Sequence, residues 1–475
     1  MIAVIFRKCR TFEAIIWSTL GAYLFLPTGV GLDFPLLPPV EKTLIANASV
    51  LIFSLWLLNN IGTQGRSFRH TTEKPRVDPV LLPIRGFCMV VGAVVCCLIL
   101  SSVATVATNS EPLFYGPLMI PGLKMNDIFS LIVEGLIAVI PFLLAVRFLN
   151  KPDHHFQILR ALSLFGLVYS ALMLIEIRMS PQLNSWLYGF FPHSFFQHFR
   201  DGSWRPIVFL AHGLRVGIYI SMAVLASLAL WRQTRRILWL MIAIWLTFIL
   251  FLSKNTGAFS LALLFSPVLI LTGVRVQILL AVCVAVTVLL YPMLRGAGFI
   301  PTISVLEIAE SINPARAQSL EYRLTHEDAL LARAKDKLLF GWGSWGRPQI
   351  HDPVTGLSLS VTDGIWIILI GAYGWFGYII QFGMLTLPLI LLFLCRSRLQ
   401  VSFVTTGLSI ILATNLIDLI PNSSLTPVTY LVAGALLGSV LYPQKGEYPI
   451  SNISYSNTDT QMETPTQIYV RHPRS

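Results

Sequence analysis

The chain has 475 residues, of which 55% are hydrophobic and only 12% are charged, whereas a soluble domain carries roughly 25% charged residues. Apolar runs of about 20 residues recur along it, which excludes a soluble globular class and predicts a polytopic membrane protein. The net charge of +11 lies largely in short loops between apolar runs, where it sets membrane topology, so we expect no nucleic-acid partner.

The apolar runs predict an all-α fold with about twelve transmembrane helices, each near the 20 residues that a bilayer requires. The run after the basic residues 1–10 has no small-residue cleavage site, so we interpret it as the first span and not as a signal peptide. The expected spans are 13–31, 43–62, 82–106, 128–147, 158–177, 207–231, 237–253, 257–274, 276–295, 364–395, 401–419 and 426–442.

Four regions follow from this pattern. An N-terminal transmembrane bundle (1–295) precedes a large polar loop (296–363), three C-terminal spans are expected in 364–442, and the polar tail (443–475) has the composition of a disordered segment. No cysteine lies in the large loop, so the sequence supports neither a disulfide framework nor a CxxC metal site.

Lysine and arginine are concentrated in every second connection, which predicts the orientation. Because such loops stay in the cytoplasm, both termini are expected there, and the loop 296–363 is expected on the periplasmic or extracellular side of a bacterial inner membrane. The basic connections hold Arg7, Lys8 and Arg10; Arg66, Arg69, Lys74 and Arg76; Arg147 and Lys151; Arg232, Arg235 and Arg236; Arg275; and Arg396 and Arg398.

A second outer stretch, 176–206, is rich in aromatic residues and carries several cationic side chains, Arg200 among them. Amphipathic aromatics with cations favour a membrane interface, so this stretch either grips a lipid headgroup or a sugar, or is a plain interfacial anchor. His212 and Arg215 follow inside an apolar run, where ionisable groups usually face a polar cavity, and Glu134 in the fourth span is a candidate partner for them.

The large loop concentrates charge in Ser319–Gly356, with a turn-rich aromatic run, FGWGSWG, at Phe340–Gly346. The chain then re-enters apolar sequence through TDGIWIILIGAYGWFGYI, Thr362–Ile379. We predict that this loop and its re-entry form the working site, held at the membrane surface by the other spans.

Three pieces of this region resemble motifs of the O-antigen ligase and polymerase superfamily of bacterial membrane glycosyltransferases. The family has a Ser-Arg-Gly tripeptide between two apolar runs. In FLSKNTGAFSLALL (Phe251–Leu264), Ser253 matches the serine of that tripeptide, and Lys254 stands in place of the arginine. The family also has an arginine that is followed by a helix and then by a Pro-x-x-Gly-x-Gly turn. Arg323 and LLFGWGSWG (Leu338–Gly346) resemble this pattern, but the proline is missing.

The re-entry carries the third piece. When Gly374 and Gly377 are aligned with the family's Gly-x-x-Gly, Trp366 falls on an aromatic position and Asp363 on a histidine that ligases are thought to use. The resemblance spans roughly Phe251 to Cys395 and favours polymerase over ligase chemistry. It is closest to an exopolysaccharide polymerase subgroup. It implies a substrate of undecaprenyl-pyrophosphate-linked oligosaccharide, membrane lipids together with a flippase and chain-length regulators as partners, and no metal, nucleotide sugar or other cofactor.

The residue types also suit this chemistry. Glycan transfer from a polyprenyl pyrophosphate needs a cationic clamp and a base that takes the proton of the attacking hydroxyl. The catalytic candidates are Asp363 as leading base, Arg323 in the clamp, and His351 and His326 as further bases. The substrate-binding candidates are Lys254, Arg347, Arg200 and Arg215, with Trp342, Trp345 and Trp366 as platforms for sugar rings.

Each candidate has a structural alternative. Arg323 and Glu327 have the i,i+4 spacing of a salt bridge on a helix surface. Asp363 has the position of a helix N-cap, and the tryptophans have the composition of interfacial anchors. As whole-protein alternatives we keep a ligase, a transporter or flippase of lipid-linked oligosaccharide, and a non-catalytic assembly partner. A transporter should place charges and helix breaks at span midpoints, whereas this chain concentrates its charges in one loop.

Overall fold

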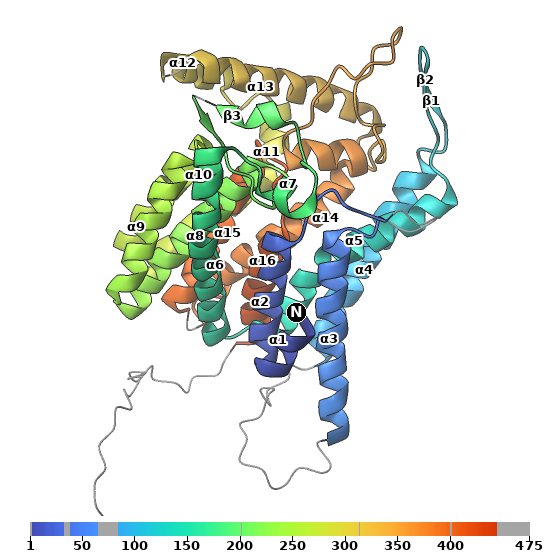
Figure 1. The fold of residues 1–475 in the computed structure, drawn as a ribbon. Coiled ribbons are helices and arrows are strands. Elements are labelled where there is room, and N and C mark those ends of the chain that lie inside the picture. The colour runs from blue at the N-terminus through green and yellow to red at the C-terminus, as the bar shows by residue number, and fades with distance from the viewer. Residues whose placement is uncertain are drawn as a thin grey trace, which may run out of the picture. The chain divides into compact units, whose positions relative to one another are not determined.

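The structure, a computed structural model, describes residues 2–32, 39–64, 84–200, 202–312, 314–399 and 401–443. Helices make up nearly all of its regular structure (Figure 1). The basic connection 65–83 and the polar tail from 444 onward lie outside the described residues, so the predictions made for them stay predictions.

Sixteen α-helices are described in the chain. They are α1 (Ile2–Lys8), α2 (Thr11–Phe25), α3 (Lys42–Gln64), α4 (Ile84–Ala107), α5 (Met125–Phe148), α6 (Pro152–Met179), α7 (Leu183–Tyr188), α8 (Gly213–Thr234), α9 (Ile237–Leu252), α10 (Thr256–Leu271), α11 (Val274–Gly296), α12 (Thr302–Ile312), α13 (Pro314–Ala334), α14 (Ile365–Leu394), α15 (Phe403–Asp418) and α16 (Pro427–Leu441). Short 3-10 turns, η1 (Phe195–His198) and η2 (Lys335–Lys337), complete the helical part.

The strands of the described residues form two small antiparallel hairpins. They pair β1 (Leu113–Tyr115) with β2 (Leu118–Ile120), and β3 (Phe199–Arg200) with β4 (Ser203–Trp204).

Among the described residues, six helices are long and apolar enough to cross a membrane: α4, α5, α6, α8, α11 and α14. The other predicted spans coincide with shorter helices, which include α9, α10, α15 and α16. The all-α membrane architecture is therefore confirmed, while the count of twelve spans stays a prediction.

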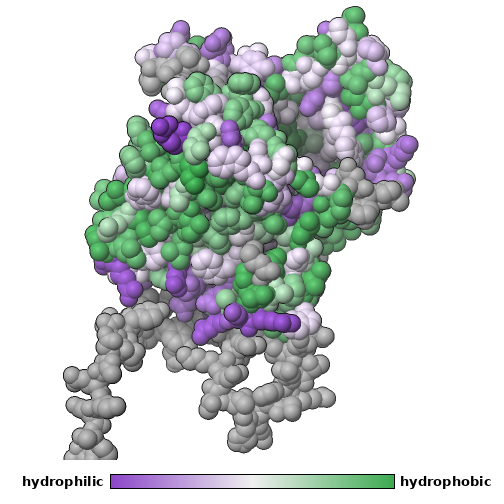
Figure 2. Space-filling view, in the orientation of Figure 1, coloured by the Kyte–Doolittle hydropathy of each residue, from purple (hydrophilic) through white to green (hydrophobic). Residues whose placement is uncertain are grey.

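Apolar side chains cover much of the outer surface of these helices. Helix α9 alone exposes Ile237, Leu238, Met241, Ile244, Trp245, Phe248 and Phe251. On the face drawn in Figure 2, hydrophobic residues occupy the middle of the helical region and hydrophilic residues gather towards both ends. A soluble monomer rarely exposes so large an apolar patch, whereas lipid contact explains it.

Helix α8 is the most buried of the candidate spans and packs against α6, α9, α10 and α15. Small residues let these helices approach closely. A Cβ at Gly166 of α6 would lie 2.7 Å from the Cβ of Ala223 of α8, and a Cβ at Gly407 of α15 would lie 2.7 Å from that of Ala229. The core is thus built around one helix that lipid does not reach.

The polar loop is largely helical. Its first half forms α12 and α13, which pack on each other, and α13 also contacts α14. Figure 1 shows α12 and α13 lying across one end of the transmembrane helices. The charged pattern of 302–334 therefore folds as amphipathic helix, because apolar positions recur at helical spacing between its charges.

Candidate functional site

The site is built around an ion pair between α13 and the start of α14. Arg323 Nε lies 3.1 Å from Asp363 Oδ2, and the two side chains are 32% and 35% exposed. Asp363 stands just before Gly364, the N-cap residue of α14, so it is not the helix cap. A pair this exposed contributes little to stability, and a ligand can reach both groups.

A second carboxylate, Asp418, lies close to the same arginine. Asp418 ends α15 and is only 5% exposed. The Ser424 hydroxyl and the Asn422 amide both donate hydrogen bonds to its carboxylate, and Arg323 acts on it electrostatically. Arg323 thus interacts with two carboxylates, one just before α14 and one at the end of α15.

Glu327, one turn beyond Arg323 on α13, is the third carboxyl of the cluster. It is 5% exposed and lies beside the buried indole of Trp366. Burial raises the pKa of Glu327 to about 7, and the Arg295 guanidinium opposes this rise without cancelling it. Arg295 itself is held by Asp328, at 2.8 Å, and by the carbonyl of Leu324. A carboxyl that titrates near neutral pH is a suitable general acid or base.

The raised pKa predicts a pH-dependent stability. The folded protein keeps the Glu327 proton up to about pH 7, whereas the unfolded chain loses it near the ordinary value of 4.5. The stability linked to this group is therefore fully present below the unfolded pKa and is lost as pH rises through the folded pKa, by about 3 kcal/mol at most.

Glu327→Gln, which cannot ionise, should raise the melting temperature at about pH 8 and leave it nearly unchanged at about pH 5. Thermal unfolding of detergent-solubilised protein at both values measures this. Equal shifts at the two pH values would contradict the assigned pKa.

A pocket of about 180 Å³ is lined by α2, α3, α5, α8 and the segment that enters α16. Two cations line it, Lys42 and Arg215. Lys42 Nζ donates to the carbonyls of Tyr23 and Leu26 and to the Thr28 hydroxyl, at 3.1 to 3.3 Å. Among the described residues, the Arg215 guanidinium has neither a hydrogen bond nor an ion pair, and Glu134 pairs with neither Arg215 nor His212.

The pocket and the carboxylate cluster are neighbours. The Tyr23 hydroxyl, which belongs to the pocket, interacts electrostatically with both Arg215 and Asp418. Asp418 in turn interacts with Arg323. The protein thus has a cationic pocket near an arginine and three carboxyl groups. Such an arrangement can bind an anionic group of a ligand in the pocket, while the carboxyl groups transfer protons.

The aromatic turn at Phe340–Gly346 holds this geometry by docking into a break in α14. At Gly374 the backbone leaves the helical region (φ 64°, ψ −166°), which frees peptide groups on either side. The carbonyls of Gly371 and Ala372 accept hydrogen bonds from the amides of Trp342 and Gly343, and the amides of Trp375 and Phe376 donate to Leu338 and Leu339. The freed groups are thus satisfied by the loop, as a bilayer requires.

Helix α4 and the residues just after it also bind this turn. The Asn109 amide donates to the Gly341 carbonyl at 2.9 Å, and the Thr105 hydroxyl donates to that of Phe340 at 2.9 Å. The end of α13 is therefore fixed relative to α14, and with it Arg323 relative to Asp363.

Arg347 and Trp366, which were predicted to contact the substrate, are buried inside the protein. Arg347 is 2% exposed, and its guanidinium donates to the carbonyls of Trp342, Pro121 and Glu111. Trp366 is completely buried and packs edge-on against Tyr291. Arg347 thus holds the loop together, and Trp366 is part of the core, so neither can face a sugar or a phosphate in this conformation.

The other tryptophans differ from each other. Arg333 lies over the Trp342 ring at 4.3 Å, and Lys337 lies at 5.4 Å, so two cations already contact this indole. Trp345 is 54% exposed and remains available as a platform.

The remaining candidates contact other parts of the protein. His326 packs on the Tyr322 ring, and His351 stands next to Tyr115 with its Nε2 3.2 Å from the Gly346 carbonyl. Lys254 has a left-handed backbone (φ 56°) after α9, and its carbonyl accepts from Arg205. The side chain of Arg200 lies outside the described residues.

Sequence reasoning missed Glu327 as a titrating group, and it missed Asp418 and Lys42 altogether. The spacing of Glu327 one turn from Arg323 was a signal in the sequence that the two side chains interact. That spacing was interpreted as an ion pair on the helix surface. Asp418 and Lys42 sit at the ends of apolar helices, where a charged residue is ordinary in sequence.

Fold and site together define a multi-pass helical membrane protein with a cationic pocket and a carboxylate cluster at one end of its helices. No family model matches this chain, and no curated protein matches it significantly.

Proposed function

We propose that this protein is a membrane glycosyltransferase. It polymerises undecaprenyl-pyrophosphate-linked oligosaccharide repeat units into an exopolysaccharide or O-antigen-like chain on the outer face of a bacterial inner membrane. The observation that supports this most directly is that Arg323 pairs with Asp363 and interacts electrostatically with Asp418. Asp418 in turn interacts with Tyr23, which lines the same pocket as Lys42 and Arg215.

The reaction divides between these groups. The acceptor hydroxyl oxygen forms a bond to the anomeric carbon of the donor sugar, and the bond from that carbon to the pyrophosphate oxygen breaks. The electron pair leaves with undecaprenyl pyrophosphate, whose growing negative charge is stabilised by arginine. Arg323 and Arg215 supply that charge. Asp363 takes the hydroxyl proton, and Glu327, with a pKa of about 7, is the alternative base.

The topology required by this reaction follows the loop charges. We propose about twelve spans, with both termini in the cytoplasm and with α12, α13 and the aromatic turn on the outer side. The shorter helices α9, α10, α15 and α16 then cross a bilayer that the protein thins locally, as short apolar segments do.

The test is polymer length in a deletion strain complemented with wild type, Arg323→Ala or Asp363→Asn at matched membrane levels. We expect long chains with wild type and single lipid-linked repeat units with each variant, because clamp and base are removed separately. Lys335→Ala, which removes an exposed charge just after α13, is the matched control and is expected to retain polymer. Normal polymer in both variants would show that the site is misassigned, and normal chain length in the deletion strain itself would refute a polymerase.

One observation favours a transporter as the second candidate. The break at Gly374 interrupts a candidate span, as in transporters with discontinuous helices. In those proteins the broken ends face the transported substrate, whereas here the aromatic turn occupies them. Accumulation of lipid-linked repeat units on the inner leaflet of the deletion strain would favour the transporter, and accumulation on the outer leaflet would favour the transferase.

A further inference from the structure

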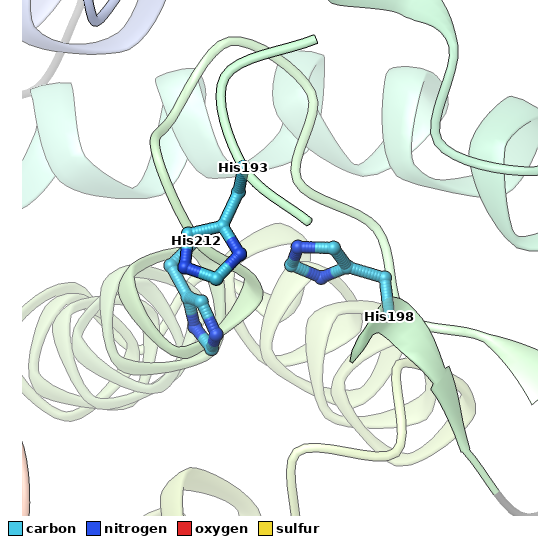
Figure 3. Close-up of side chains that lie close together, drawn as sticks. All are labelled: His193, His198 and His212. Atoms are coloured by element: carbon cyan, nitrogen blue, oxygen red, sulfur yellow. The ribbon is translucent and has the colours of Figure 1, made fainter. Parts of the chain in front are cut away.

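Three histidines gather in the outer connection between α7 and α8, separate from the carboxylate cluster. His193 lies in the loop after α7, His198 ends η1, and His212 is the N-cap residue of α8. Figure 3 shows their imidazole rings directed towards one another from three separate segments. The ring centroids are 4.9 to 5.6 Å apart, and one ring nitrogen of each histidine lies within 4.8 Å of the other two.

This convergence is not explained by packing alone. His198 is fully buried, His212 is partly buried and His193 is exposed, so the group runs from the interior to the surface. Phe191 packs against His198 at 5.9 Å. Three imidazoles that converge from a buried position to an exposed one are the ligand set of a three-histidine metal centre.

We propose that His193, His198 and His212 bind one divalent transition-metal ion, with Zn²⁺ as the favoured metal. Three nitrogen ligands leave at least one coordination position open, which is the arrangement of reactive zinc sites and not of closed structural ones. The site is independent of the proposed glycosyl transfer, and it departs from the expectation that no metal takes part.

The neighbourhood imposes two conditions on such a site. His212 Nδ1 accepts a hydrogen bond from the Leu214 amide at 3.1 Å, so ligation by His212 must exchange this bond or shift the tautomer. Arg205 and Arg215 both act electrostatically on His212 and oppose a cation. An anionic oxygen at the open position, from hydroxide or a phosphate group, offsets that charge.

The test is metal binding by the full chain, purified in detergent with a tag that contains no histidine. Co²⁺, whose visible spectrum reports its geometry, is titrated and then displaced by Zn²⁺, and bound metal is counted by mass spectrometry. We expect one ion per chain, and His193→Ala should weaken binding by at least about 10-fold. His193 is exposed, so this variant leaves the packing intact, and His351→Ala is the matched control with unchanged binding.

Two results would overturn the proposal. One is a wild-type chain that binds no stoichiometric Co²⁺ or Zn²⁺ while its melting curve shows it to be folded. The other is equal affinity in wild type and His193→Ala.

Discussion

Gly374→Ala is expected to destabilise the protein by about 3 kcal/mol or more, a sum of backbone strain, overpacking and lost hydrogen bonds. The residue has φ 64°, and an added Cβ would lie 2.3 Å from the carbonyl group of Leu339. The methyl group must therefore push the aromatic turn out of the break in α14 and leave peptide groups of the helix unsatisfied.

The same helix contains its own control. Gly383 has no heavy atom within 4 Å of an added Cβ, so Gly383→Ala should be neutral or slightly stabilising. Thermal unfolding of both variants in one detergent measures the difference. If Gly374→Ala melts like wild type, the aromatic turn does not dock in the break as described.

Removing the charge of Arg215 should have the second large effect, on activity and not on folding. Arg215→Gln is expected to slow transfer by about 100-fold or more, the usual cost of losing one preorganised group that stabilises developing charge. The guanidinium lines the pocket without a protein partner among the described residues, so its loss leaves no buried group unsatisfied. Transfer from a purified lipid-linked donor, followed by product length in a reconstituted membrane, measures the rate.

Arg275→Gln is the matched control, because Arg275 is an exposed arginine in the first turn of α11, at the opposite end of that helix from Arg295. Its loss should leave the rate within about 2-fold of wild type, as for a surface charge remote from the site. A comparable loss in both variants would mean that the effect comes from general surface charge. An unchanged rate in Arg215→Gln would remove the pocket from the mechanism.

The placement of helices was largely predictable from the sequence. Runs such as 128–147 and 276–295 fall inside α5 and α11, because burial in a bilayer demands both apolar composition and continuous helix. The aromatic turn at Phe340–Gly346 was also predictable, since clustered glycines mark turns.

The role of that turn was not predictable. The turn bonds Gly371 and Ala372, and the preceding Leu338 and Leu339 bond Trp375 and Phe376. A sequence does not reveal which distant peptide groups a loop will satisfy. Gly374 and Gly377 were recognised as a motif, but only the structure shows that the first is a helix break.

The sequence by itself determined the all-α membrane class and the location of the charged loop, because hydropathy and charge are properties of local segments. The pairing of Arg323 with Asp363, the burial of Arg347 and Trp366, and the convergence of His193, His198 and His212 were decided by tertiary structure. These features depend on which segments meet in space, and the charge of a residue alone does not determine whether its partner is a ligand, a carbonyl or another helix.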